Sequence, residues 1–237
     1  MNYALIFAGG VGKRMLTNSL PKQFMEIHGK PIIAYTLEHF QSHDEIDKIV
    51  FVCVASHITL ARKIVEDYRF NKVIDIVPGG RTGQESIFHG LERIVMESCD
   101  DDIVLIHDGV RPLIDASLIS DNIDGVKRYG NTVSAKHAYE TCCLADGNGN
   151  ITEILDRARC VTVKAPQSFY IKDIWASHLK AKEEGITDAT DSASLIAHYG
   201  GSLHYVDCSV MNIKITTLAD FYIFKAIIDE QINKTIF

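Results

Sequence analysis

The sequence lacks several features that would assign it to a common class of protein. No stretch approaches the roughly 20 apolar residues that a membrane-spanning helix needs. No block of Lys and Arg stands out, and 24 basic against 31 acidic side chains give a formal net charge of −7. This composition argues against a nucleic-acid binder and against a protein that binds anionic membranes. It still allows a local positive site for an anionic small molecule.

The sequence also lacks any arrangement of cysteines typical of metal binding. The six cysteines are scattered, two of them adjacent, and no CxxC pair occurs, so neither a zinc site nor a disulfide framework is expected. We expect all six to be packing thiols. They are Cys53, Cys99, Cys142, Cys143, Cys160 and Cys208. The first residues, MNYALIFAGG, carry no basic segment before their apolar run, so they predict a strand and not a signal peptide. We therefore expect a cytoplasmic location.

Continuous apolar runs alternate with amphipathic stretches in the first half of the chain. Such runs are typical of strands buried on both faces, as in parallel sheets covered by helices. The predicted strands span 3–8, 48–54, 73–77 and 102–107, and the predicted helices span 31–41, 58–68, 83–97 and 117–129. The pattern predicts an α/β protein with a Rossmann-like, doubly wound, mainly parallel sheet, whose ligands bind at the carboxyl ends of the strands.

The second half of the chain begins with a different pattern. The segment 138–156 contains DGNGN between two strand-like arms, which predicts a protruding β-hairpin over about 138–160. Further predictions are helices over 172–184, 191–200 and 218–232 and strands over 202–206 and 212–216. Because no repeat and no linker interrupts the chain, we expect residues 1–237 to form a single domain with an inserted arm.

The loop after the first strand reads AGGVGKRM and is suited to phosphate. Glycines allow successive backbone N–H groups to close around phosphate oxygens, and basic side chains add charge there. The residues concerned are Ala8, Gly9, Gly10, Gly12, Lys13 and Arg14. The third glycine of a dinucleotide fingerprint would fall at Met15, which argues against a dinucleotide-dependent oxidoreductase, and the loop is not a Walker A loop either. A tight strand-to-helix turn without a ligand is the alternative.

PKQF follows at residues 21–24, with Lys22 eight residues after Arg14, and the combination of the two motifs is far more specific than either. It resembles the CTP-using nucleotidyltransferases that cytidylylate 2-C-methyl-D-erythritol 4-phosphate or ribitol 5-phosphate. Further matches follow in order along nearly the whole chain: GGRTGQES (79–86), HDGVRP (107–112), Glu140 and Thr141, LDR (155–157), APQSF (165–169), TDSASL (190–195) and NIKIT (212–216).

The reaction that this resemblance implies needs charge neutralisation and alignment rather than a general base. A substrate phosphate oxygen, already an anion, attacks the α-phosphorus of CTP, and pyrophosphate leaves. The resemblance assigns catalytic roles to Arg14, Lys22 and Lys214, nucleotide binding to the loop residues with Gly80, Ser86 and Asp108, and acceptor binding to Asp108, Arg111, Thr141 and Arg157. Asp108 is also the candidate ligand for Mg²⁺. His107 beside it is expected to be structural.

The resemblance also implies partners. In the family the acceptor-binding residues of the arm come from the neighbouring subunit, so a homodimer is expected, with CTP and a polyol phosphate as substrates. HDGVRP and the alanine before PQSF, Ala165, favour ribitol 5-phosphate or a related alditol phosphate, because erythritol-type enzymes usually have a threonine there. The alternative is the methylerythritol type, and a remoter one is an inactive nucleotide-binding regulator. Arg81 and Gly83 depart from the usual family pattern.

Overall fold

A seven-stranded sheet forms the centre of the computed structural model, which describes residues 1–9 and 20–236. Its strands lie in the order β11-β7-β10-β6-β1-β4-β5, and all neighbours are parallel except β10, which is antiparallel to both β6 and β7. The strands are β1 (Asn2–Ala8), β4 (Lys48–Cys53), β5 (Val73–Pro78), β6 (Ile103–Asp108), β7 (Thr132–His137), β10 (Val161–Tyr170) and β11 (His204–Asp207). The expected α/β class with a mainly parallel sheet is confirmed.

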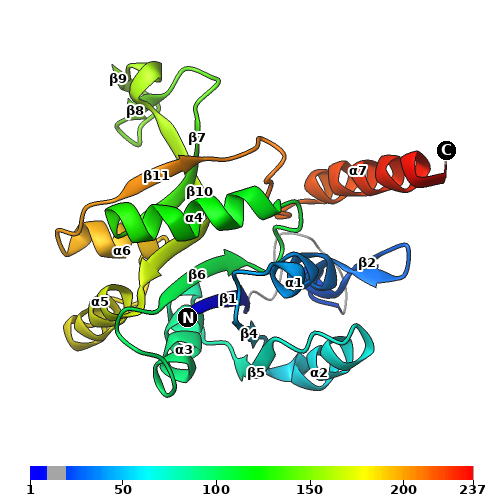
Figure 1. Cartoon of the computed structure of the whole chain (residues 1–237). Helices are drawn as coiled ribbons and strands as arrows, with labels where there is room; N and C mark the ends of the chain where they lie inside the picture. Colours follow the sequence, from blue (N-terminus) through cyan, green and yellow to red (C-terminus); the bar gives the residue numbers. More distant parts are fainter. Residues whose placement is uncertain (10–19, 237) are drawn as a thin grey trace.

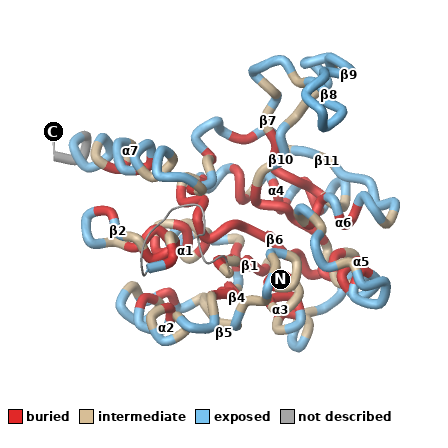
Figure 2. Tube along the Cα trace, turned by 180° about the vertical axis from the view of Figure 1, so that it is seen from behind, coloured by how far each residue is buried: buried red, intermediate tan, exposed pale blue. Residues whose placement is uncertain are grey.

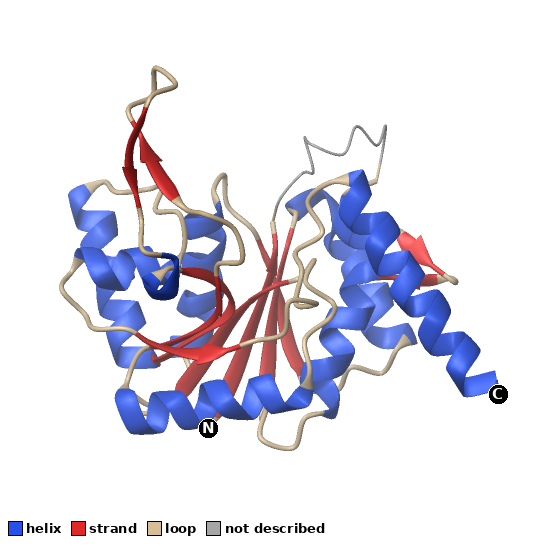
Figure 3. Cartoon of the chain, turned by 90° about the horizontal axis from the view of Figure 1, so that it is seen from above, coloured by secondary structure: helices blue, strands red, loops and turns tan. Residues whose placement is uncertain are grey.

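Helices cover both faces of the sheet (Figure 3). Alternate residues of β1 point to opposite faces, so Ala4 and Ile6 join one core and Tyr3 and Leu5 join the other, all fully buried. The first core includes α1 (Ile32–Ser42), α2 (Ile58–Asp67) and α4 (Ala116–Tyr129). The second includes α3 (Gly83–Val95), α5 (Ile171–Glu184) and α6 (Ser192–His198). Burial on both faces explains why these strands read as continuous apolar runs.

Two expectations about strands were wrong, and two strands were missed. The segment 212–216 is a loop and not a strand. Within it, the Ile215 N–H donates a hydrogen bond to the Val110 carbonyl at 2.8 Å. Strand β5 is half-buried rather than buried on both faces, because it is the last strand at one edge of the sheet. Strands β7 and β10 were not predicted, and the predicted strand 202–206 lies at 204–207.

The predicted hairpin is present and projects away from the sheet (Figure 1). Strand β8 (Cys143–Ala145) pairs antiparallel with β9 (Ile151–Ile154), and Gly147 and Gly149 have φ of 81° and 94° in the turn between them. Both strands are exposed (Figure 2). We refer to residues 138–160 as the arm. Its use in dimerisation stays a prediction.

The cysteines differ from expectation. All six are free, as expected, but only Cys53 and Cys208 are buried. Cys99 and Cys143 are exposed, and the other two are of intermediate exposure, so packing in the core accounts for only two of the six.

The remaining elements of the described residues are a C-terminal helix, short strands and 3₁₀ turns. Helix α7 (Leu218–Ile236) buries Phe224 and Ile228 against Ile32, Val110 and Ile215, and the short strands β2 (Glu26–Ile27) and β3 (Lys30–Pro31) lie beside α1. The 3₁₀ turns are η1 (Lys22–Phe24), η2 (Ala55–His57) and η3 (Arg157–Arg159). Within the described ranges, no helix combines the length and apolar character needed to cross a membrane.

Candidate functional site

The candidate site lies where the direction of the chain through the sheet reverses. The chain runs from β1 to β4 and β5 on one side and then crosses to β6 on the other side of β1, where Phe7 pairs with Asp108. Ligands of such sheets bind at this crevice, outside the carboxyl ends of the strands. The loops after β1, β5 and β6 therefore meet at one edge, together with the loop 212–216, which is hydrogen-bonded to the loop after β6.

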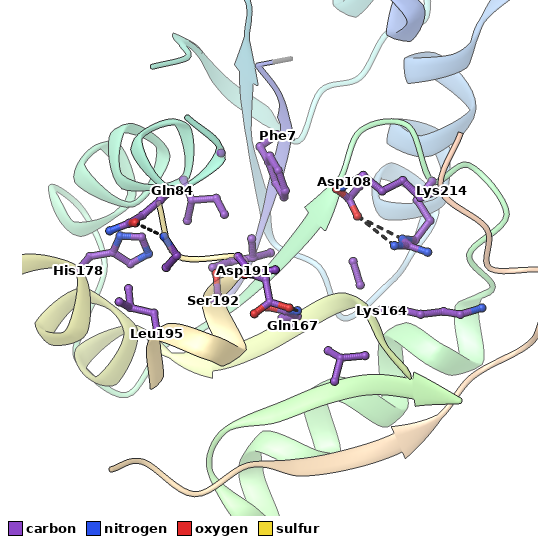
Figure 4. Close-up of a pocket in the computed structure, with 18 residues that line it drawn as sticks. Phe7, Gln84, Asp108, Lys164, Gln167, His178, Asp191, Ser192, Leu195 and Lys214 are labelled. Atoms are coloured by element: carbon purple, nitrogen blue, oxygen red, sulfur yellow. Dashed lines mark hydrogen bonds and ion pairs between the residues drawn. The ribbon is translucent and has the colours of Figure 1, made fainter. Parts of the chain in front are cut away.

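Asp108, the last residue of β6, lies at the centre of this edge. The residue is 6% exposed. Its Oδ1 lies 2.6 Å from Lys214 Nζ, and its Oδ2 lies 3.2 Å from Arg111 Nη2. Burial alone would raise the pKa of the Asp108 carboxyl, but the cations of Lys214 and Arg111 outweigh it and hold that pKa below its ordinary value. Figure 4 shows Asp108 and Lys214 joined in this way. The carboxylate is therefore ionised.

Arg111 and Lys214 contribute differently to this cluster. Arg111 is 7% exposed and also donates from Nη1 to the Asn212 carbonyl at 2.8 Å, so it ties the loop 212–216 to β6. Lys214 has a 42% exposed side chain and lines two cavities. Its ammonium is thus available to ligands on either side of it.

The first cavity, of about 300 Å³, is lined by all of the predicted nucleotide-binding residues that the structure describes. Lys22 and Lys214, both predicted to be catalytic, line it together, and Lys22 Nζ donates to the Ile215 carbonyl at 2.8 Å. The predicted residues along it are Ala8, Gly9, Lys22, Gly80, Ser86, Asp108 and Lys214. Gly10, Gly12, Lys13 and Arg14 lie outside the described residues.

The loop after β5 is shaped by the start of α3. Ser86 Oγ accepts from the Gly80 N–H at 3.1 Å and donates to the Thr82 carbonyl at 2.8 Å. Thr82 caps α3 by accepting from the Glu85 N–H at 3.1 Å. A Cβ on Gly9 would lie 2.5 Å from Ser86 Oγ, so only glycine lets the loop after β1 pass this close. Arg81 is exposed, and its backbone N–H is bound by Glu85 Oε2 at 2.6 Å.

The second cavity, also about 300 Å³, lies on the other side of the Asp108 and Lys214 pair. It contains the predicted acceptor residues Asp108 and Arg111, and Ala165. Sequence reasoning gave no role to several polar residues that line it: Gln84, Lys164, Gln167, His178, Thr190, Asp191 and Ser192. Burial lowers the pKa of the Lys164 ammonium from its ordinary value. Two cavities that share one ion pair can hold two ligands whose reacting ends meet there.

Thr141 and Arg157 are the predicted residues that this chain does not bring to the centre. Both are exposed in the arm and line neither of the two cavities. Arg157 Nη1 donates to the Tyr139 carbonyl at 3.2 Å, and Thr141 lines a separate open cavity of about 520 Å³ near the arm.

Two further residues support the site: Gln23, which lines the first cavity, and His107, which lines neither of the two cavities. Gln23, 1% exposed, was missed, and its Nε2 donates to the Ala8 carbonyl at 2.8 Å, which fixes the end of β1. His107 is structural, as expected: it is fully buried, and its Nε2 donates to the Arg111 carbonyl at 3.0 Å. Burial lowers the pKa of His107 to about 3, so the ring is neutral.

The charge arrangement limits how a metal ion would bind. The described residues contain no group of three or more His, Cys, Asp or Glu side chains positioned to hold a metal ion. Asp108 offers a single carboxylate, and both of its oxygens are paired with cations. One carboxylate together with substrate phosphates is a common donor set for Mg²⁺, so Asp108 fits that role only with a phosphate ligand present.

Comparisons with known proteins identify relatives of this chain. The family model for IspD, 2-C-methyl-D-erythritol 4-phosphate cytidylyltransferase, matches residues 3–230. Ribitol-5-phosphate cytidylyltransferases from Streptococcus agalactiae and Vibrio parahaemolyticus are 48% identical over 237 residues, which is 100% of this chain and 99% and 100% of theirs. A 2-C-methyl-D-erythritol 4-phosphate cytidylyltransferase from Clostridium acetobutylicum is 38% identical over 223 residues, 94% of this chain and 95% of that protein.

A solved structure shows the same architecture. The crystal structure of 4-diphosphocytidyl-2C-methyl-D-erythritol synthase from Anaerococcus prevotii matches with a TM-score of 0.83 at 25% identity, covering 96% of this chain and 98% of that chain. The family model covers most of the chain, and the curated relatives match it along almost its full length. The chain therefore belongs to the IspD family and is a nucleotidyltransferase of the cytidylyltransferase type.

Proposed function

We propose that this protein transfers CMP from CTP to ribitol 5-phosphate, or to a closely related alditol phosphate, giving CDP-ribitol and pyrophosphate. The observation that carries the proposal is the meeting of two cavities at one ion pair, Asp108 and Lys214. The choice of acceptor is supported by the relatives, since those named for ribitol 5-phosphate are 48% identical and the one from Clostridium acetobutylicum named for methylerythritol phosphate is 38% identical.

In this proposal CTP occupies the first cavity. The acceptor phosphate oxygen attacks the α-phosphorus, a new P–O bond forms, and the bond from the α-phosphorus to the oxygen bridging to the β-phosphate breaks, so that its electron pair leaves with pyrophosphate. Lys22 and Lys214 line this cavity and neutralise charge that gathers on the phosphates as the bond order changes. Arg14 is assigned the same role by resemblance, and Gly80 and Ser86 bind the cytosine.

The acceptor occupies the second cavity, with its phosphate against Lys214. Asp108 and Arg111 then lie at the reacting end, where the carboxylate oxygens accept hydrogen bonds from hydroxyl groups. Ala165 removes a hydroxyl from the wall of this cavity relative to a threonine, and it leaves room for a longer polyol. Thr141 and Arg157, exposed in the arm, complete the phosphate site from a second subunit of a homodimer.

Mg²⁺ bound by the CTP phosphates and Asp108 would offset negative charge on the triphosphate during transfer. The cytoplasmic location expected from the sequence remains part of this proposal.

Methylerythritol phosphate is the second candidate acceptor, because the family model that matches residues 3–230 is described by that activity. Pyrophosphate release, measured with CTP, Mg²⁺ and each acceptor in turn, tests the proposal. We expect rapid release with ribitol 5-phosphate and none after chelation of the metal. If no polyol phosphate led to pyrophosphate release, the proposed reaction would be wrong and the protein would be better described as an inactive nucleotide-binding regulator.

A further inference from the structure

Two buried polar atoms in the second cavity have no hydrogen-bond partner in the part of the chain that the structure describes. They are His178 Nε2, from α5, and Ser192 Oγ, from the first turn of α6. Each residue is only 2% exposed, and both line the cavity. Because buried polar side chains are nearly always paired, two unpaired ones in one cavity point to a ligand that supplies the missing partners.

Two polar neighbours, Gln167 and Gln84, are by contrast already hydrogen-bonded to the chain through both their amide nitrogen and their amide oxygen. Gln167 donates from Nε2 to Asp191 Oδ2 at 2.9 Å and accepts from the Ala193 N–H at 2.9 Å. Gln84 likewise donates to the Ile186 carbonyl at 2.7 Å and accepts from the Ala189 N–H at 2.9 Å. These two amides are used to hold the loop before α6 and the start of that helix in place. They form a frame around His178 and Ser192 rather than a contact surface for ligands.

The position of the two atoms in the cavity indicates which part of a ligand they meet. Figure 4 shows His178 and Leu195 at the end of the cavity remote from Asp108 and Lys214, with Ser192 between the two ends. The charged end suits a phosphate. At the other end, burial lowers the pKa of His178 to about 4, so the ring is neutral near pH 7. A neutral imidazole and a hydroxyl are suited to hydroxyl groups and not to a second anion.

We propose that His178 and Ser192 bind the hydroxyl groups of the acceptor that lie farthest from its phosphate, and thereby select for the length of the alditol chain. This inference rests on the proposed alditol phosphate acceptor. A three-carbon alditol phosphate anchored at Lys214 would leave both polar atoms unpaired, whereas the five-carbon chain of ribitol 5-phosphate extends further toward them. A site that is built to bind hydroxyl groups discriminates strongly against analogues that lack them.

The test compares Ser192→Ala and His178→Leu with the unaltered protein. Steady-state pyrophosphate release is measured with ribitol 5-phosphate and with glycerol 3-phosphate, varying the concentration of each acceptor and then that of CTP. We expect each variant to raise the KM for ribitol 5-phosphate about tenfold, while the KM for CTP and the KM for glycerol 3-phosphate change less than about twofold. His178→Asn, which keeps a side-chain donor, is expected to recover part of the loss. Ser192→Ala is a small change that tests the proposal even if His178→Leu does not fold.

Two serines beside these residues provide matched controls. Ser194→Ala changes an exposed residue of α6, and Ser177→Ala changes the neighbour of His178 in α5, whose Oγ donates to the Asp173 carbonyl at 2.9 Å. Neither side chain lines the cavity, so both controls are expected to keep the normal preference between the two acceptors. An equal rise in KM for both acceptors in Ser192→Ala, or no rise for ribitol 5-phosphate, would overturn the inference.

Calorimetric titration of ribitol 5-phosphate without CTP separates this inference from the proposed function. Weaker binding by Ser192→Ala than by the unaltered protein supports the inference even if no pyrophosphate is released, in which case only the proposed reaction fails. Turnover with binding and KM unchanged in both variants leaves the reaction standing and overturns the inference. If the unaltered protein neither binds nor converts any alditol phosphate, both are wrong.

Discussion

The cluster around Asp108 and the arm hold their predicted binding residues in opposite ways. Asp108 and Arg111 are buried, ion-paired and tied to the loop 212–216, so their geometry is complete within one chain. Thr141 and Arg157 are exposed on a hairpin, and outside the two central cavities. A preorganised charge cluster suits chemistry that depends on fixed electrostatics. An exposed arm suits contacts that a second subunit completes.

Lys214→Ala tests the cluster with the largest expected effect. Removing one cation that neutralises the phosphates is expected to lower kcat by about 10²–10³. The fold is expected to persist because the Lys214 side chain is 42% exposed. The measurement is pyrophosphate release, with circular dichroism as a check of folding. Lys225→Ala is the matched control, since that lysine is 46% exposed and paired with Asp229 on α7. A loss of less than about threefold in Lys214→Ala would remove this lysine from the chemistry.

Asp108→Asn tests whether the cluster also stabilises the fold. It leaves the Arg111 guanidinium, in a residue 7% exposed, without its carboxylate, and unpaired buried charges of this kind cost about 3 kcal/mol or more in the free energy of unfolding. Urea denaturation measures the loss. Asp124→Asn is the comparison, because its pair with Lys127 is exposed and worth little. Equal stabilities for the two variants would contradict the role of the cluster in folding.

His107, beside Asp108, makes the free energy of unfolding depend on pH. Its pKa is about 3 in the folded protein and near 6.5 in an unfolded chain, so between these values the unfolded state binds more protons. Stability is therefore expected to fall as pH drops below 6.5, by on the order of 2 kcal/mol at pH 5 from this residue. His107→Gln keeps a donor for the Arg111 carbonyl and is expected to flatten that dependence in urea denaturation. An unchanged slope would mean that other groups cause it.

Arg157→Ala tests the arm, where the expected effect is smallest. The residue is exposed, so the free energy of unfolding should stay within about 0.5 kcal/mol of normal. The KM for the acceptor is expected to rise about tenfold through loss of a charge-assisted phosphate contact. Urea denaturation and pyrophosphate release measure the two quantities. Lys180→Ala, an exposed basic residue of α5, is the control.

Mixing variants distinguishes an arm that acts on its own chain from one that acts on a partner. If Arg157 acts in a homodimer across the interface, random mixing of Arg157→Ala with Lys214→Ala chains creates one intact site in each mixed dimer, and about a quarter of normal activity returns. If the arm serves its own chain, the mixture shows only the average of the two variants.

The sheet was predictable to the extent that its strands are apolar. Strands β7 and β10 were missed because polar residues interrupt their apolar runs. These polar residues are buried and hydrogen-bonded inside the protein. Ser168 Oγ donates to Asn122 Oδ1 at 3.0 Å, and Ser134 Oγ accepts from Asn122 Nδ2 at 3.0 Å and donates to the Pro166 carbonyl at 2.9 Å. A hydropathy pattern predicts that such polar residues are exposed, although the side chains of Asn122, Ser134 and Ser168 are all fully buried.

The candidate site was predictable where it follows strand ends and motifs. Asp108, Gly80 and Ser86 came from such positions, and the structure brings them to one cavity. His178 and Ser192 lie on helices, in segments that mix apolar and polar residues. Whether a polar side chain in a helix is paired depends on what packs against it, and the sequence does not carry that information. The ion pair between Lys214 and Asp108, about a hundred residues apart in the sequence, was not predicted for the same reason.

The central claim is that this cytidylyltransferase acts on an alditol phosphate. Its most direct test supplies limiting CTP, Mg²⁺ and equal concentrations of ribitol 5-phosphate and 2-C-methyl-D-erythritol 4-phosphate, and separates the two CDP products. The account predicts that CDP-ribitol dominates the product. A product made up mainly of the CDP derivative of methylerythritol would contradict it.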